Sequence, residues 1–137
     1  MAEEKIESIQ LNRPLTEAER EILTWLLEHG AKGATAYIAQ IPQIKVIRQC
    51  GCGCPTLDFT VSGKHGQGES TIVADFLGTT PEQAYVGVLV HVREGVLSEL
   101  EAYSLSDIKK FTFPRIEDLR PFGPPELRPL NLSGEST

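Results

Sequence analysis

The three cysteines of the chain lie within five consecutive residues, at Cys50, Cys52 and Cys54, and only glycines separate them. Thiolates bind zinc and other soft metal ions, so this spacing first suggests a metal site. In an extended strand the sulfurs would share one face but would lie about 6.6 Å apart, too far for one ion to hold all three. A bend is therefore required, and Gly51 and Gly53 permit one.

Three interpretations of this cluster remain open. A zinc site needs a fourth ligand, and His65, in the glycine-rich turn over 63–68, is the available candidate. A redox site would join two of the thiols in a strained, reducible disulfide. Basic neighbours activate a thiolate, and Arg48 is the one basic residue beside the cluster in the sequence, so strong activation is not indicated. A purely structural bend would bury three small apolar side chains between two strands.

Two strands predicted over 84–92 and 96–105 form a hairpin with a tight turn at 94–95. Two registers are compatible with this turn, and a one-residue slip exchanges the buried and exposed faces. We expect a three-residue loop with a bulge, which places Val90 opposite Leu100. This register collects the apolar residues of both strands on one face.

The same register leaves His91, Glu99 and Glu101 together on the other face of the hairpin. A histidine beside a carboxylate can act as a general base. An ordinary solvated ion pair is the competing interpretation. Asp58, which follows the cysteine bend, and Tyr103 complete the residues of a candidate small-molecule pocket on this face.

An amphipathic helix is predicted over 17–29, ahead of the cysteines. Thr16 and Glu19 have the spacing of a capping box, in which each side chain accepts a backbone N–H at the helix start. Isoleucine and leucine then recur with the helical period, and Gly30 is typical of a left-handed helix end. A shorter helical segment is predicted within 33–41, and Pro42 is expected to end it.

After the helices the apolar period changes to two, which is typical of strands. Segments 44–50, 56–63 and 70–78 therefore join the hairpin in an antiparallel sheet of about five strands. The predicted fold class is α+β, with the N-terminal helix and a short second helix packed on this sheet. Cystatin-like and nuclear-transport-factor-like cones, several of which enclose a small-molecule pocket, are the alternative by analogy.

The chain is predicted to form one domain over 1–137, long enough to bury roughly two-thirds of the surface of its unfolded state. Residues 1–14 show little periodicity and are expected to be loosely held. The proline-rich segment 111–130 is expected to wrap over the domain as extended chain, since prolines interrupt a sheet. The tail at 131–137 is expected to fray.

The net charge of −6 argues against nucleic acid as a partner, because binding to a duplex requires a basic surface. The longest apolar run is too short for a membrane span. The N-terminal stretch is acidic and lacks the apolar region of a signal peptide. These features predict a cytoplasmic protein whose cysteines are kept reduced.

The stretches RPLTEAEREILTWLLEHG, CGCGCPTLDF and GVLSELEAYS resemble a family of small, uncharacterised bacterial proteins. Its members share the patterns C-x-C-G-C-P-[ST]-[ILV]-D and G-x-L-x-x-L-E-x-Y-S. The resemblance covers about Arg13 to Ser104, so the proline-rich end lies outside it. No activity is assigned to that family, and the resemblance therefore implies no chemistry. The corresponding positions are Cys50, Cys52, Cys54, Pro55, Asp58, Glu101 and Tyr103.

No Ser-His-Asp pattern, phosphate-binding loop or dinucleotide fingerprint is present in the sequence. The leading interpretation is therefore a non-enzymatic binding or interaction module whose partner is a protein or a small molecule. One alternative is a protein that binds zinc or another soft metal through the cysteine cluster, with His65 as the fourth ligand. The other is a small-molecule enzyme that uses the polar face of the hairpin.

Overall fold

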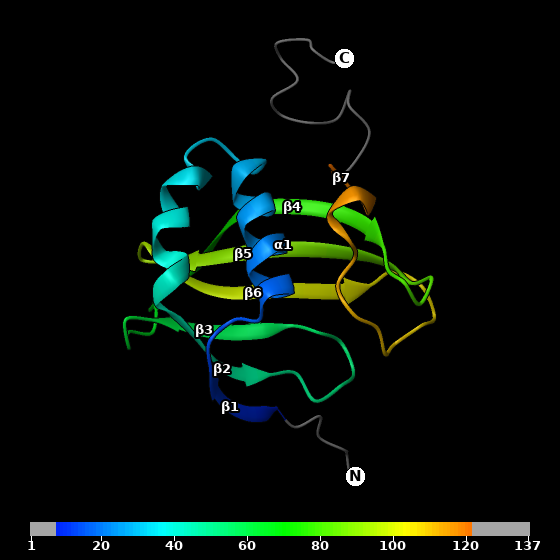
Figure 1. Cartoon of the computed structure of the whole chain (residues 1–137), viewed down its shortest axis with the longest axis horizontal. Helices are drawn as coiled ribbons and strands as arrows, with labels where there is room; N and C mark the ends of the chain where they lie inside the picture. Colours follow the sequence, from blue (N-terminus) through cyan, green and yellow to red (C-terminus); the bar gives the residue numbers. More distant parts are fainter. Residues whose placement is uncertain (1–7, 122–137) are drawn as a thin grey trace.

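A seven-stranded antiparallel sheet carries two helices on one of its faces in the computed structural model, which describes residues 8–121 (Figure 1). The order of the strands across the sheet is β1-β2-β3-β6-β5-β4-β7. The helices on the face are α1 (Glu17–Glu28) and the 3-10 helix η1 (Ala34–Gln43), and a short 3-10 turn, η2 (Ile116–Asp118), lies beside α1. The strands are β1 (Ile9–Arg13), β2 (Ile44–Gln49), β3 (Leu57–Val61), β4 (Ser70–Thr79), β5 (Tyr85–Arg93), β6 (Val96–Ser104) and β7 (Leu119–Pro121). The predicted α+β class is confirmed.

Helix α1 begins at the predicted capping box. The backbone N–H of Glu19 donates to Thr16 Oγ1 over 3.1 Å, and the Thr16 N–H donates to Glu19 Oε1 over 2.8 Å. Ile22, Leu23 and two further leucines form the stripe that is buried against the sheet. Local sequence and tertiary packing therefore agree on where this helix starts and which way it faces.

Gly30 has a different role from the predicted left-handed helix end. The positive φ lies three residues later, at Gly33 (φ 89°). At Gly30 an added Cβ would overlap the carbonyl oxygen of Val73, and the next residue, Ala31, donates its N–H to that oxygen over 2.8 Å. The glycine thus allows the end of α1 to approach the backbone of β4 closely.

The sheet has seven strands rather than about five, because a short strand is added at each edge. Strand β1 lies in the segment that was expected to be loosely held, and it pairs with β2 in an irregular register. The Arg13 guanidinium also forms two hydrogen bonds with the carboxylate of Glu19, at 2.8 and 3.0 Å. The exposed side chains of β1 carry no strong alternation, so its pairing with β2 is a tertiary effect.

Strand β7 lies within the proline-rich segment and pairs with β4 at the other edge of the sheet. Proline is tolerated there because an edge strand has a free side that needs no N–H donor. Phe111, at the start of the segment, is buried in the core. The rest of the expected wrap, 122–130, and the expected frayed tail, 131–137, lie outside the described residues.

The hairpin of β5 and β6 has the predicted register, with Val90 opposite Leu100. The loop is a two-residue turn rather than a three-residue one, because Glu94 (φ 49°) and Gly95 (φ 78°) both adopt left-handed conformations. The extra residue is Ser98, which has no pairing partner on β5, because Leu97 pairs with Val92 and Glu99 pairs with His91. Its hydroxyl donates to the carbonyl oxygen of His91 over 3.2 Å. The bulge is therefore inside β6, not in the loop.

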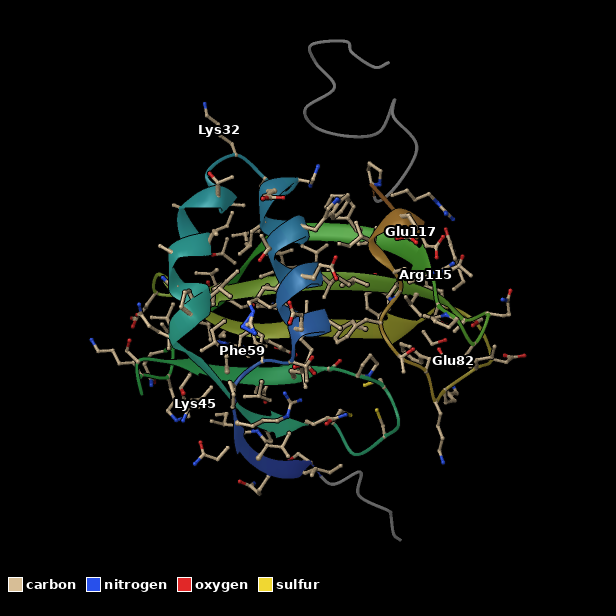
Figure 2. All side chains as sticks on the ribbon, in the orientation of Figure 1. Lys32, Lys45, Phe59, Glu82, Arg115 and Glu117 are labelled. Atoms are coloured by element: carbon tan, nitrogen blue, oxygen red, sulfur yellow. The ribbon has the colours of Figure 1, made fainter. Side chains whose placement is uncertain are left out.

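The core lies between the helices and the sheet, where Figure 2 shows the side chains filling the space between the ribbons. Phe59 of β3 belongs to it and is 2% exposed, whereas Lys32 and Lys45 are exposed at the outside. Both helices lie on the same face, so no helix within residues 8–121 covers the other face of the central strands. No helix of the described chain is both long and apolar enough to cross a membrane.

The close contact between Gly87 of β5 and Tyr103 of β6 generates a test of this register. The two residues are paired across the strands, and a Cβ on Gly87 would overlap the tyrosine ring. We expect Gly87→Ala to lower the free energy of unfolding by about 1–3 kcal/mol, the usual cost of overpacking. Urea denaturation measures this loss. In a Tyr103→Ala background the penalty should largely disappear, and an equal loss in both backgrounds would contradict the contact.

Candidate functional site

The loop between β2 and β3 folds the three cysteines into a compact group. Cys50 Sγ lies 2.6 Å from Cys52 Sγ, which in turn lies 3.0 Å from Cys54 Sγ. The three sulfurs are all within 4.8 Å of one another, and each side chain is half-buried. They are free thiols, and Figure 2 shows the sulfur atoms gathered at this loop. The bend that the sequence required is therefore present.

Backbone contacts hold the bend closed. The Cys50 N–H donates to the carbonyl oxygen of Thr56 over 3.1 Å, which joins the two ends of the loop. Gly53, at the tip, has φ 109°, a conformation that strains any residue with a Cβ. Its carbonyl oxygen accepts from the Phe111 N–H over 3.2 Å, and the side chain of Lys110 packs against its Cα. The segment that leads to Phe111 therefore braces the cysteine loop.

Thr56 attaches the loop to the central strand β6. Its hydroxyl donates to the carbonyl oxygen of Ala102 over 3.1 Å and accepts from the N–H of the same residue over 2.9 Å. Cys54 Sγ in turn donates to Thr56 Oγ1 over 3.4 Å. One hydroxyl thus links the sulfurs to the middle of the sheet, a role that sequence reasoning missed because it depends on which strand lies beside β3.

The three thiols are not electrostatically equivalent. Burial, together with its hydrogen bond to Cys52, raises the pKa of the Cys50 thiol to about 12. Burial also raises the pKa of Cys52, but the hydrogen bonds between Cys52 and its neighbours Cys50 and Cys54 outweigh this effect and lower its pKa overall. The Cys52 thiol therefore ionises more readily than the Cys50 thiol.

The structure does not bring His65 to the cysteines. His65 is exposed in the loop that follows the C-terminal end of β3, whereas the cysteines precede its N-terminal end. Five strand residues separate the two ends by about 13 Å. Within residues 8–121, the group of potential metal ligands around the sulfurs consists of the three cysteines themselves.

A second group of potential ligands lies on the uncovered face of the sheet. His91 Nε2 is 2.7 Å from Glu101 Oε1, and the ligand atoms of His91, Glu99 and Glu101 all lie within 4.8 Å of one another. His91 Nδ1 is 3.1 Å from the hydroxyl of Ser70, on the neighbouring strand β4. The predicted gathering of the three residues is confirmed, and Ser70 is a further partner that the sequence did not indicate.

Asp58 and Tyr103 flank this second group on opposite sides. Asp58 pairs with Glu99 across β3 and β6, and its carboxylate is 3.0 Å from Arg48 Nε. Tyr103 lies over Gly87, and burial, followed by the charges of Asp75 and Glu101, raises the pKa of its phenol. The five residues predicted for a pocket thus share one face of the sheet.

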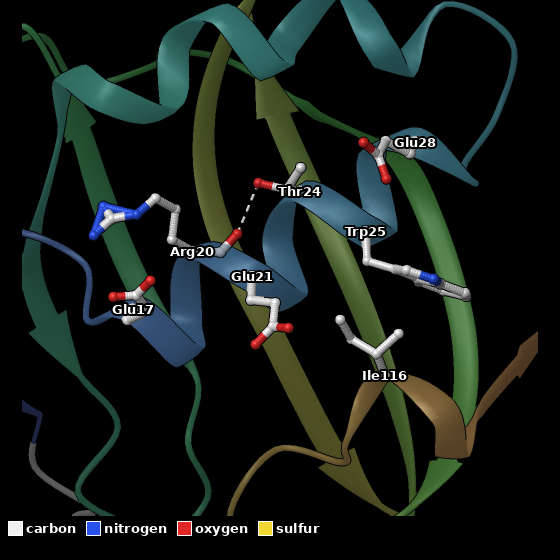
Figure 3. Close-up of a pocket in the computed structure, with 7 residues that line it drawn as sticks. All are labelled: Glu17, Arg20, Glu21, Thr24, Trp25, Glu28 and Ile116. Carbon is white, nitrogen blue, oxygen red and sulfur yellow. Dashed lines mark hydrogen bonds between the residues drawn. The ribbon is translucent and has the colours of Figure 1, made fainter.

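A hollow of about 450 Å³ lies elsewhere, on the outer face of α1 (Figure 3). Part of its wall is formed by Arg20 and Trp25 of α1 and by Ile116 of η2. The dashed line in the figure marks the hydrogen bond that the Thr24 hydroxyl donates to the Arg20 carbonyl oxygen over 2.8 Å. Its remaining polar lining consists of glutamates of the helix surface. Neither the cysteines nor the His91 group contributes to it, so it is separate from both groups of potential ligands.

Comparison with known proteins adds no functional label, because the chain matches no protein-family model, no curated protein and no solved structure. The resemblance of the cysteine and hairpin motifs to a bacterial family therefore stays a prediction. The chemistry of the two groups of side chains has to support the functional argument by itself.

The double hydrogen bond of Thr56 provides a test of how the cysteine loop is attached. Thr56→Val keeps the shape but leaves the buried N–H and carbonyl of Ala102 without their partner. We expect the free energy of unfolding to fall by about 1–3 kcal/mol and the thiols to react faster with a disulfide reagent. Thr56→Ser, which keeps the hydroxyl, is the matched control and should behave like the unaltered chain. A valine variant with unchanged stability and thiol reactivity would rule out this anchor.

Proposed function

We propose that the chain binds a thiophilic metal ion of the zinc class through Cys50, Cys52 and Cys54. The observation that supports this best is the convergence of the three sulfurs within 4.8 Å. Thiolates are ligands that zinc and other soft ions prefer. A loop that merely turned the chain would not need three sulfurs on one side of it.

The loop needs little movement to accept an ion. With Zn–S bonds of about 2.3 Å, tetrahedral coordination sets the sulfurs about 3.8 Å apart. The two shortest separations are 2.6 and 3.0 Å, so the thiols would spread by about 1 Å as they lose their protons and their mutual hydrogen bonds. The N–H groups of Cys52 and Cys54 lie 3.4 Å from the sulfurs of Cys50 and Cys52, where they favour thiolates.

Three protein ligands leave one coordination position open in a tetrahedral site. Closed structural zinc sites have four protein ligands, whereas sites with three keep a position for water or an incoming group. His65 does not fill that position, because β3 separates it from the cysteines. The bound ion would therefore stay accessible to water or to an incoming ligand, which favours reversible binding over a closed structural site.

The zinc site is tested by titrating the reduced chain with Zn²⁺ against a chromophoric chelator. We expect one ion per chain, and Cys52→Ser should weaken the affinity by more than about 100-fold, the upper range for loss of an outer-shell partner. His65→Ala is the matched control and should bind zinc as the unaltered chain does. Stoichiometric binding that survives Cys52→Ser would overturn the proposal, and an equal loss with His65→Ala would contradict the open position.

The affinity for zinc should rise with pH between about 6 and 8. The pKa of Cys50 is about 12, so this thiol is protonated over the whole range and must release its proton to bind the ion. Raising the pH lowers the cost of that release. Repeating the titration across this pH range measures the change in affinity, and titration calorimetry in buffers with different ionisation enthalpies measures the protons released. An affinity that does not change with pH would contradict thiolate ligation.

A reversible disulfide between Cys50 and Cys52 is a second candidate function. Their sulfurs are the closest pair, at 2.6 Å, against about 2.05 Å in a disulfide. The lowered pKa of Cys52 would also supply a thiolate for exchange. Oxidised glutathione, which accepts the two electrons and both thiol hydrogens and leaves as two molecules of glutathione, should then convert Cys50 and Cys52 to a disulfide in a Cys54→Ser variant. Mass spectrometry of the intact chain detects the loss of about 2 Da. A variant that stays fully reduced, or forms only intermolecular disulfides, excludes this function.

A further inference from the structure

The uncovered face of the sheet holds a second set of ligands on rigid supports. His91 lies on β5, and Glu99 and Glu101 lie on β6, the two strands at the centre of the sheet. The side chain of His91 is 11% exposed and that of Glu101 is 32% exposed, so both are largely withdrawn from water. Side chains on paired central strands are held more precisely than those on loops.

The imidazole of His91 is oriented from both sides. Ser70 Oγ lies 3.1 Å from Nδ1, and Glu101 Oε1 lies 2.7 Å from Nε2. A histidine that binds a metal typically has one nitrogen free for the ion and the other held by an outer partner. Ser70 is placed to be that partner, which leaves Nε2 directed toward the two carboxylates.

Neither carboxylate of this group, Glu99 or Glu101, is ion-paired with an arginine or lysine within residues 8–121. Within residues 8–121 the Glu99 carboxylate forms no hydrogen bond or ion pair. Its oxygen nevertheless lies within 4.8 Å of the ligand atoms of His91 and Glu101. Asp58 lies opposite Glu99 and has Arg48 as its partner, while the guanidinium of Arg93 donates to the carbonyl oxygen of Gly68.

We propose that His91, Glu99 and Glu101 bind a divalent cation of the Mn²⁺ class, at a site separate from the cysteines. Carboxylates suit hard cations and imidazole suits the first-row transition metals, so one imidazole with two carboxylates favours an ion between these classes. Three ligands leave further positions for water or for an oxygen atom of a small molecule. A dication also balances the charge of the two carboxylates. The soft sulfurs and this harder set therefore select different ions.

The site is tested with Mn²⁺ and the full chain carrying Cys50→Ser, Cys52→Ser and Cys54→Ser, which removes the thiolates. Loss of the free Mn²⁺ signal in electron paramagnetic resonance measures binding. We expect one ion per chain, and Glu99→Gln and Glu101→Gln should each weaken the affinity at least about tenfold. Glu28→Gln, an exposed carboxylate on α1, is the matched control and should leave the affinity unchanged.

Two further measurements separate ligation from folding. The far-ultraviolet dichroism and the thermal midpoint of each variant without metal establish that it is folded. Electron spin-echo modulation of the bound Mn²⁺ should contain nitrogen coupling from an imidazole, and this coupling should vanish in His91→Gln. The proposal is overturned if the chain binds no Mn²⁺, if the nitrogen coupling is absent or survives His91→Gln, or if Glu28→Gln weakens binding as much as Glu101→Gln. Because the cysteines are absent from this chain, failure here leaves the zinc proposal intact.

Discussion

The pairing of β5 with β6 is the constraint on which the rest of the structure depends. The left-handed turn at Glu94 and Gly95 starts the hairpin in one register, and the bulge at Ser98 shifts it by one residue. That shift sends the apolar side chains of both strands toward the helices and leaves His91, Glu99 and Glu101 on the other face. Without the bulge, the residues of β6 that follow it would exchange faces, and Leu100, which is buried, would face water.

The cysteine loop depends on the same strand by a longer route. Only two residue pairs join β3 to β6, and the hydroxyl of Thr56 extends this contact by binding both backbone groups of Ala102. From the other side, the N–H of Phe111 holds the tip of the loop. The sulfurs are therefore positioned by β6 and by a segment more than fifty residues downstream, although all three are neighbours in the sequence.

Two sets of donor atoms with opposite chemical preferences thus share one small sheet. The sulfurs lie half-buried in a loop at the end of two strands, and thiolates prefer soft ions. The imidazole and carboxylates lie on central strands, where neighbouring backbones and Ser70 fix their directions. The two groups therefore differ in their support, because one lies in a loop and the other on paired strands.

The sequence by itself determined the elements whose signals are local: the capping box of α1, the change of period at β2, the hairpin and the gathering of its polar residues on one face. It also indicated that the cysteines require a bend. It could not determine the edge strands β1 and β7, the close approach at Gly30, the partners Thr56 and Ser70, or the distance between the cysteines and His65. Those depend on which strands become neighbours, and the energy of such pairings comes from contacts between residues far apart in the chain.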